Sequence, residues 1–193
     1  MKVAGISGSL RQASFNTALL RAAIELAPEG MTIQTASIAD IPLYNDDLWQ
    51  AAGFPAPVAA LRSAIADADA LLIASPEYNF SIPGVLKNAI DWASRPPDHP
   101  FAGKPVALMS ASNGMLGGAR AQYHLRQACV YLDMHPLNKP EVFVSRASEK
   151  FDANGTLTDE PTRQHVRALL DSLFRWATLL ARGAPSVPTR PRA

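Results

Sequence analysis

Short apolar runs alternate with segments of helical periodicity from one end of the chain to the other. The run at 68–75 is almost continuously apolar, which is typical of a strand covered by helices on both faces. Strands and helices that alternate in this way predict an α/β fold with a parallel sheet and right-handed crossovers. The predicted strands cover residues 2–7, 31–36, 68–75, 105–110 and 141–145, and the predicted helices cover residues 14–27, 59–67, 85–92, 118–132 and 161–181.

The length of 193 residues fits one domain, which we expect to cover residues 1–182. Residues 183–193 contain three prolines and two arginines without apolar periodicity, so we predict a disordered tail there. The segment 43–57 is predicted to be a long connecting loop, and loops of that length are often functional. Its Trp49 and Phe54 either pack locally, which we prefer, or cover the site of a neighbouring subunit.

The charges are nearly balanced, with 18 basic and 17 acidic residues, so we predict neither a nucleic acid nor a membrane surface as partner. No apolar run is long enough to span a bilayer and the first residues do not resemble a signal peptide, which predicts a soluble, cytoplasmic protein. The single cysteine, Cys129, excludes an intrachain disulfide and is expected on the buried side of a helix. Four scattered histidines predict no metal site.

Unusual residues follow the first predicted strand, in the loop at 8–16. In an open α/β sheet, ligands bind beyond the carboxyl ends of the strands. The loop has neither a Gly-x-Gly-x-x-Gly nor a Gly-Lys-Ser/Thr motif, which disfavours a tightly bound dinucleotide and a P-loop. Donors from Ser9, Arg11, Ser14 and Asn16, together with the start of a helix, suit a phosphate monoester. The alternative is that Ser14 only caps the helix and Arg11 is solvated.

Two further loops are expected at the same edge of the sheet, after the third and fourth strands. In the loop at 76–84, Tyr78 and Phe80 suit the flanks of a planar ring, or simply pack in a turn. Glu77 there either belongs to the site or only stabilises the start of the following helix. The loop at 110–120 contains three glycines and two serines, which let a backbone lie close to a flat ligand.

These motifs resemble the NADPH-dependent FMN reductase family. The resemblance rests on Gly8-Ser9-Leu10-Arg11 with Ser14 and Asn16, and on residues 76–84 followed by 86–92, and it extends from about residue 2 to 180. Residues 117–120 followed by 122–127 are most similar to the bacterial quinone and chromate reductase branch. The resemblance implies a flavodoxin-like, doubly wound five-stranded parallel sheet in the order 2-1-3-4-5, bound FMN, and NADPH or NADH as a transient substrate.

The resemblance also assigns residues to the cofactor. It places the FMN phosphate on the first loop, residues 77–80 around the isoalloxazine, and Ser112 with Gly114 beside the ring. No catalytic side chain is expected because FMN carries the chemistry. The complete predicted cofactor-binding set is Ser9, Leu10, Arg11, Ser14, Phe15, Asn16, Pro76, Glu77, Tyr78, Asn79, Phe80, Ser110, Ser112, Gly114 and Gly117.

The predicted function is reduction of quinones by ping-pong hydride transfer through bound FMN, with flavins, azo compounds and chromate as further candidate acceptors. One alternative is a non-enzymatic electron carrier of the flavodoxin type, although such carriers use an acidic docking surface that this balanced chain does not suggest. Another is an FMN reductase that supplies a partner monooxygenase. The resemblance further implies a homodimer or homotetramer, with Arg120, Tyr123 and Glu141 near a subunit contact.

Overall fold

The computed structural model describes residues 1–183. The predicted tail lies outside this range except for Gly183, which ends the last helix. The elements are, in order, β1 (Lys2–Ser7), α1 (Phe15–Glu25), β2 (Thr32–Ala36), α2 (Asp46–Ala52), α3 (Ala56–Ala66), β3 (Ala70–Ala74), α4 (Gly84–Ala93), β4 (Pro105–Ala111), α5 (Ala119–Tyr131), β5 (His135–Pro136), β6 (Val142–Val144), the 3-10 turn η1 (Ala147–Glu149) and α6 (Glu160–Gly183).

The strands form one parallel sheet in the order β2-β1-β3-β4-β5, which confirms the predicted flavodoxin-like topology. Ile6 of β1 pairs with Ile73 of β3, and Ile73 pairs with Leu108 of β4. Because these strands are in step, the loops that follow β1, β3 and β4 leave the sheet at the same edge.

Two short strands, β5 and β6, share the fifth position of the sheet, at the edge beside β4. The two-residue β5 pairs with the start of β4, and β6, the predicted strand at 141–145, pairs with its end from Met109 to Ala111. A strand as short as β5, with Pro136 in it, carries no period-two pattern that sequence reasoning can detect.

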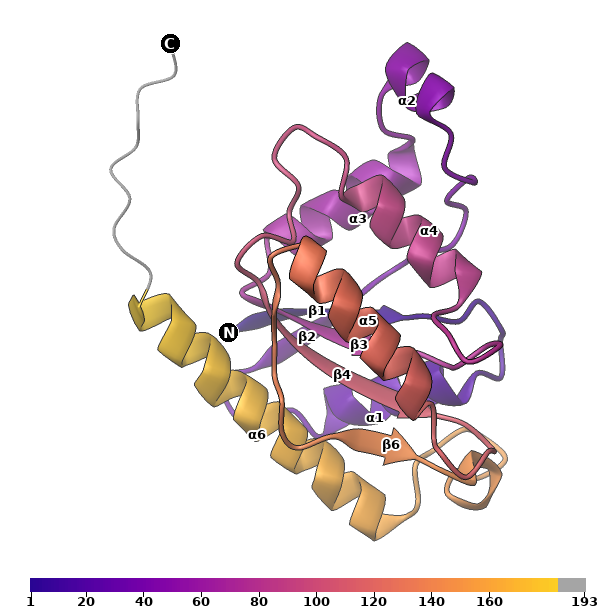
Figure 1. Ribbon diagram of the computed structural model, residues 1–193. Coiled ribbons are helices and arrows are strands. Elements are labelled where there is room, and N and C mark those ends of the chain that lie inside the picture. Colours follow the sequence, from indigo (N-terminus) through magenta and orange to yellow (C-terminus); the bar gives the residue numbers. More distant parts are fainter. Residues whose placement is uncertain (184–193) are drawn as a thin grey trace.

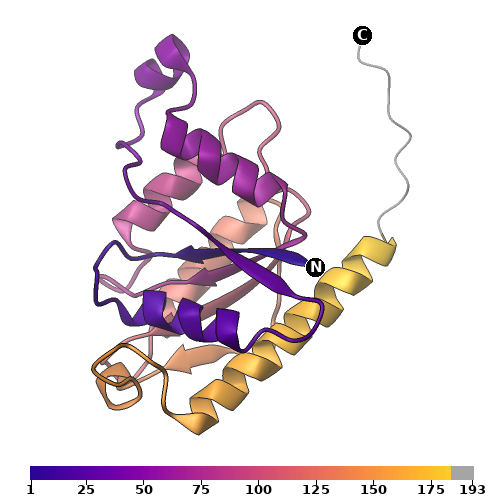
Figure 2. The same cartoon turned by 180° about the vertical axis from the view of Figure 1, so that it is seen from behind.

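Helices cover both faces of the sheet (Figures 1 and 2). Successive side chains of β3 enter opposite cores: Leu72 packs in the core that α1 and α6 close, while Leu71 and Ile73 pack in the core of α3, α4 and α5. This two-sided burial explains why the run at 68–75 is largely apolar. Cys129 is buried in the second core as expected, and burial raises the pKa of its thiol to about 11.

The segment 43–57 is not a plain loop, because it contains α2. Asn45 caps this helix by accepting a hydrogen bond from the Asp47 amide, 2.9 Å away. None of the helix's residues is buried, and α2 stands away from the sheet in both views (Figures 1 and 2). Trp49 lies with its ring centroid 6.4 Å from that of Phe54, in agreement with the local packing that we preferred.

Candidate functional site

A crevice of about 400 Å³ lies at the carboxyl edge, between the loops that follow β1, β3 and β4. The volume is within the usual range for small-ligand sites. Nine of the predicted residues line it: Ser9, Arg11, Ser14, Phe15, Asn16, Pro76, Glu77, Tyr78 and Ser112. Six do not: Leu10, Asn79, Phe80, Ser110, Gly114 and Gly117.

The first loop presents its donors around the start of α1. The buried Ser14 hydroxyl oxygen accepts hydrogen bonds from the amides of Asn16 and Thr17, at 3.2 and 3.4 Å. Ser14 therefore caps the helix, and its own O–H is left to donate to a ligand. The Arg11 guanidinium lies 5.7 Å from the centre of the Phe15 ring, and it has no hydrogen-bond acceptor among residues 1–183. A cation without a partner beside a helix start favours an anion.

Asn16 uses its side chain within the protein. It is 2% exposed; its Nδ2 donates to the Ala111 carbonyl and its Oδ1 accepts from the Ala111 amide, both at 2.9 Å. Asn16 thus joins α1 to the end of β4 and fixes two of the three loops relative to each other. Sequence reasoning recognised the amide as a polar group of the site but not its partner, which is 95 residues away along the chain.

The second loop turns sharply at Tyr78–Ser81, where the two residues exchange backbone hydrogen bonds of 3.1 and 2.9 Å. Asn79 and Phe80 at its centre have φ values of 49° and 65°, a left-handed conformation that non-glycine residues rarely adopt. Tyr78, 51% exposed, lines the crevice, whereas the Phe80 ring is 63% exposed and lies 3.6 Å below the Arg120 guanidinium. In this structure the two aromatic rings therefore do not flank the crevice together.

Glu77 points its carboxylate to the start of α5. Its oxygens accept hydrogen bonds from the Arg120 and Ala121 amides at 3.0 and 3.2 Å and from Arg120 Nε at 2.6 Å. A carboxylate at a helix N-terminus is stabilised by the helix dipole. Glu77 therefore does contact the start of a helix, as one of the two predicted alternatives states. The helix is α5, however, and not α4, which directly follows the loop. The contact ties the second loop to the third.

The third loop contributes Ser112 to the lining of the crevice. Its other predicted residues, Ser110, Gly114 and Gly117, do not line the crevice, and Ser110 and Gly117 hold the loop in its conformation. The buried Ser110 hydroxyl donates to the Gly117 carbonyl at 2.6 Å and accepts from Gln122 Nε2 at 2.8 Å. Gly117 has a φ of 57°, and a Cβ there would lie 2.8 Å from the backbone of Phe143. Only glycine fits such a position.

Two residues of the crevice were missed, Ala111 and Asn113. Ala111 is an ordinary strand residue, and no sequence signal distinguishes it. Asn113 lies inside the loop we singled out, and its Oδ1 accepts a hydrogen bond from the Ser148 amide at 2.9 Å. Leu10, although predicted, is exposed beside the crevice and does not line it.

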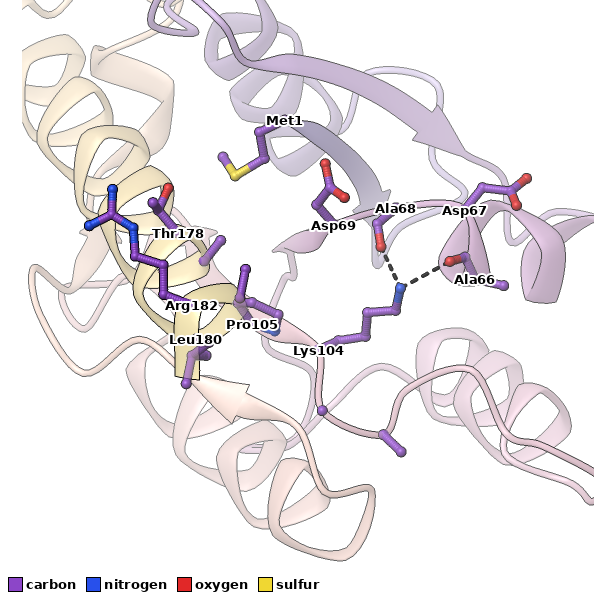
Figure 3. Close-up of a pocket in the computed structure, with 14 residues that line it drawn as sticks. Met1, Ala66, Asp67, Ala68, Asp69, Lys104, Pro105, Thr178, Leu180 and Arg182 are labelled. Carbon is purple, nitrogen blue, oxygen red and sulfur yellow. Dashed lines mark hydrogen bonds between the residues drawn. The ribbon is translucent and has the colours of Figure 1, made fainter. Parts of the chain in front are cut away.

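A larger hollow, of about 730 Å³, opens at the opposite, amino edge of the sheet (Figure 3). Lys104 enters it and donates to the carbonyls of Ala66, at 3.0 Å, and Ala68. Asp69 Oδ2 there accepts a hydrogen bond from the Lys2 amide at 2.7 Å. Burial lowers the pKa of Lys104. These polar groups already bond to the chain itself, and ligand sites of open α/β sheets lie at the other edge, so we take the smaller crevice as the candidate site.

Between residues 1 and 183, no three His, Cys, Asp or Glu side chains gather in a way that could hold a metal ion. In the same range, no helix is both long and apolar enough to cross a membrane.

The crevice fits a phosphorylated planar group. It combines the Arg11 guanidinium, which has no acceptor among residues 1–183, with the O–H of Ser14, the start of a helix and a half-exposed tyrosine ring. Fold and site together define a doubly wound α/β protein that binds a phosphorylated ligand at its carboxyl edge.

Comparison with known proteins narrows that class. The model of the NADPH-dependent FMN reductase family matches residues 1–149. The chain is 57% identical to the NAD(P)H-dependent FMN reductase of Pseudomonas aeruginosa, over 93% of this chain and 97% of that protein. It is 48% identical to a quinone reductase of Escherichia coli, over 88% and 92% of the two chains. The structure of a flavoenzyme NAD(P)H:(acceptor) oxidoreductase from Paracoccus denitrificans superposes with a TM-score of 0.84, at 37% identity over 92% and 97%.

The chain therefore belongs to the NADPH-dependent FMN reductase family. As a member of this family it is an FMN-dependent oxidoreductase with NAD(P)H as its substrate, which confirms the family and the cofactors that the sequence predicts.

Proposed function

We propose that the protein is an NAD(P)H:quinone oxidoreductase that binds FMN in the carboxyl-edge crevice. The observation that carries this proposal is the crevice itself, where a guanidinium without an acceptor among residues 1–183 faces the start of a capped helix. The full-length similarity to quinone reductases supports the choice of acceptor. Bound FMN supplies the hydride chemistry.

The residues of the chain bind and orient the cofactor. Arg11 would supply the positive charge that balances the phosphate, and the hydroxyls of Ser9 and Ser14 would donate hydrogen bonds to it. The backbone of 76–79 orients the isoalloxazine, and the hydrogen bonds of Glu77 hold this backbone against α5. Ser112 and Asn113 form the wall beside the ring. Asn16 keeps the first and third loops at a fixed separation, so the site is formed before the cofactor arrives.

The crevice is open to solvent on one side, so NAD(P)H and the acceptor take turns at the same face. This predicts ping-pong kinetics and a broad range of acceptors, among them azo compounds and chromate. A balanced surface charge favours the enzyme over an electron carrier that docks on protein partners. A cytoplasmic location is part of the proposal.

We further propose a homodimer or homotetramer with α5 at a subunit contact. Tyr123 is exposed and its hydroxyl donates to Glu141 Oε1 at 2.9 Å, while Lys139 holds the other oxygen at 2.6 Å. Arg120 lies on the same helix with its guanidinium over the exposed Phe80 ring. Exposed Tyr, Phe and Arg side chains are the types that are enriched in protein interfaces.

The test is anaerobic reduction of the purified protein. NADPH should bleach the absorption of the oxidised flavin at about 450 nm. A quinone should then restore it. A bound flavin that neither NADPH nor NADH reduces would favour the carrier. A flavin that is reduced but leaves the protein on each turnover would favour the FMN reductase that serves a monooxygenase. Intersecting rather than parallel initial-rate lines would exclude ping-pong kinetics.

A further inference from the structure

A second hollow adjoins the crevice across the loop between β4 and α5. Its volume is about 330 Å³, and Met115 from that loop forms part of its lining. Ser112 and Asn113 of the same loop line the crevice, so the two hollows share one wall. An extended molecule that lies over this loop can therefore occupy both. The residues that line the second hollow are Met115, Ser145, Arg146, Glu149 and Lys150.

The second hollow is held firmly against the crevice. The Ala147 amide donates to the Ser112 carbonyl at 3.1 Å, and the Ser148 amide donates to Asn113 Oδ1 at 2.9 Å. The Ser112 amide in turn donates to the Val144 carbonyl at 2.9 Å. With three hydrogen bonds between the loop and the segment 144–148, the position of Arg146 relative to the crevice is fixed by the backbone.

Two properties of Arg146 bear on its availability to a ligand. Its φ of 47° and ψ of 48° place it in the left-handed region, which is unfavourable for any residue with a side chain. Its exposed guanidinium has no hydrogen-bond or ion-pair partner between residues 1 and 183. The neighbouring Lys150 differs, because its ammonium lies 3.5 Å from Asp159 and 3.2 Å from the Thr162 hydroxyl. Arg146 is thus the cation available to a ligand.

Glu149 lines the same hollow as Arg146. In dinucleotide sites, a carboxylate binds the adenosine ribose 2′-hydroxyl of NADH, while an arginine accommodates the 2′-phosphate of NADPH. A hollow that offers both groups can accept either dinucleotide. The absence of a Gly-x-Gly-x-x-Gly motif agrees with such weak, side-chain-based binding of a substrate that must leave on each turnover.

We propose that this hollow is the adenosine-ribose subsite for the transient NAD(P)H substrate, with Arg146 binding the 2′-phosphate of NADPH and Glu149 the 2′-hydroxyl of NADH. This inference rests on the proposed function, since it extends the same substrate beyond the crevice. According to this proposal, the preference of the enzyme for NADPH or NADH depends on Arg146 and Glu149, which do not line the FMN crevice.

The experiment compares Arg146→Gly and Glu149→Gln with the parent protein. Glycine tolerates the positive φ of residue 146, so the first variant removes the guanidinium without strain. We expect Arg146→Gly to raise the KM for NADPH roughly tenfold, the loss of one charge-assisted interaction, and to leave the KM for NADH within about twofold. Glu149→Gln should raise the KM for NADH and not that for NADPH. Arg182→Ala, at the opposite edge, should change neither value.

A binding measurement separates this inference from the proposed function. Calorimetric titration with 2′-AMP and 5′-AMP needs no catalysis, and 2′-AMP should bind the parent protein but lose most of its affinity in Arg146→Gly. Equal 2′-AMP affinity in both proteins, or an unchanged ratio of NADPH to NADH efficiency, would overturn the subsite. If neither dinucleotide reduces the parent protein while 2′-AMP binding still depends on Arg146, the proposed function fails and the subsite stands.

Discussion

The hollow at the amino edge of the sheet is nearly twice as large as the crevice at the carboxyl edge, about 730 against 400 Å³. The two differ in what Lys104 and Arg11, one basic residue of each, bind within the chain. Lys104 at the amino edge donates to the carbonyls of Ala66 and Ala68, whereas the Arg11 guanidinium at the carboxyl edge has no hydrogen-bond acceptor among residues 1–183. A binding site is better recognised by donors left free in a fixed frame than by volume.

The largest loss of stability and of FMN affinity should come from removing the side chain of Asn16, which joins two of the loops around the crevice. Asn16→Ala leaves the amide and the carbonyl of Ala111 buried without partners, so we expect the free energy of unfolding to fall by about 2–4 kcal/mol. FMN affinity should fall as well, because the loops after β1 and β4 lose their tie. Chemical denaturation and flavin fluorescence titration measure the two quantities.

Asn88 offers a matched control for Asn16. Its side chain also bridges backbone groups, accepting from the Tyr44 amide and donating to the Pro42 carbonyl, both at 2.8 Å, but it lies away from the crevice. Asn88→Ala should reduce stability and leave FMN affinity unchanged. Equal loss of FMN affinity in both variants would mean that Asn16 acts only through global stability.

The second effect concerns the charge at each edge. Arg11→Ala removes a guanidinium that we place on the FMN phosphate, and charge-assisted hydrogen bonds contribute about 1.5–3 kcal/mol. The dissociation constant for FMN should therefore rise by roughly 10- to 150-fold, with little change in the midpoint of thermal unfolding of the apoprotein. Arg182→Ala should not alter FMN affinity, and if it matched Arg11→Ala the contrast between the two edges would be lost.

The third effect is on the contact between the second loop and α5. Glu77→Gln keeps one acceptor for the amides of Arg120 and Ala121 but loses the charge, and we expect a loss of about 1–2 kcal/mol in unfolding free energy. Glu160→Gln breaks an exposed pair with Arg167 and should cost about 0–1 kcal/mol. Denaturant midpoints at one pH compare the two, and a larger loss for Glu160→Gln would contradict the role we give to Glu77.

The sequence was informative where a local pattern determines the structure. The apolar run at 68–75 and the helical periodicities predict a parallel α/β sheet, because burial on two faces leaves a readable pattern, whereas the strand order follows from the family resemblance. Loop positions at the carboxyl edge follow from that topology. The hydrogen-bond partners of the loop residues do not follow from the topology. Asn16 pairs with Ala111 and Glu77 with the start of α5, and these partners are 95 and 43 residues apart in the sequence. Sequence reasoning therefore found the lining of the crevice more readily than the hydrogen bonds behind it.

The smallest effect tests the amino edge by pH. Burial lowers the pKa of Lys104 below its ordinary 10.5, so the folded protein releases this proton at a lower pH than the unfolded chain does. Between the lowered pKa and 10.5 the unfolded state binds more protons, and the contribution of Lys104 to stability rises with pH. Lys104→Met removes this dependence. The unfolding free energy of the parent relative to the variant should thus increase as the pH approaches 10.5, while FMN affinity at pH 7 stays the same in both proteins. If Lys104→Met bound FMN more weakly than the parent protein, the amino-edge hollow would affect the carboxyl-edge crevice. The conclusion that only the carboxyl edge binds the ligand would then be wrong.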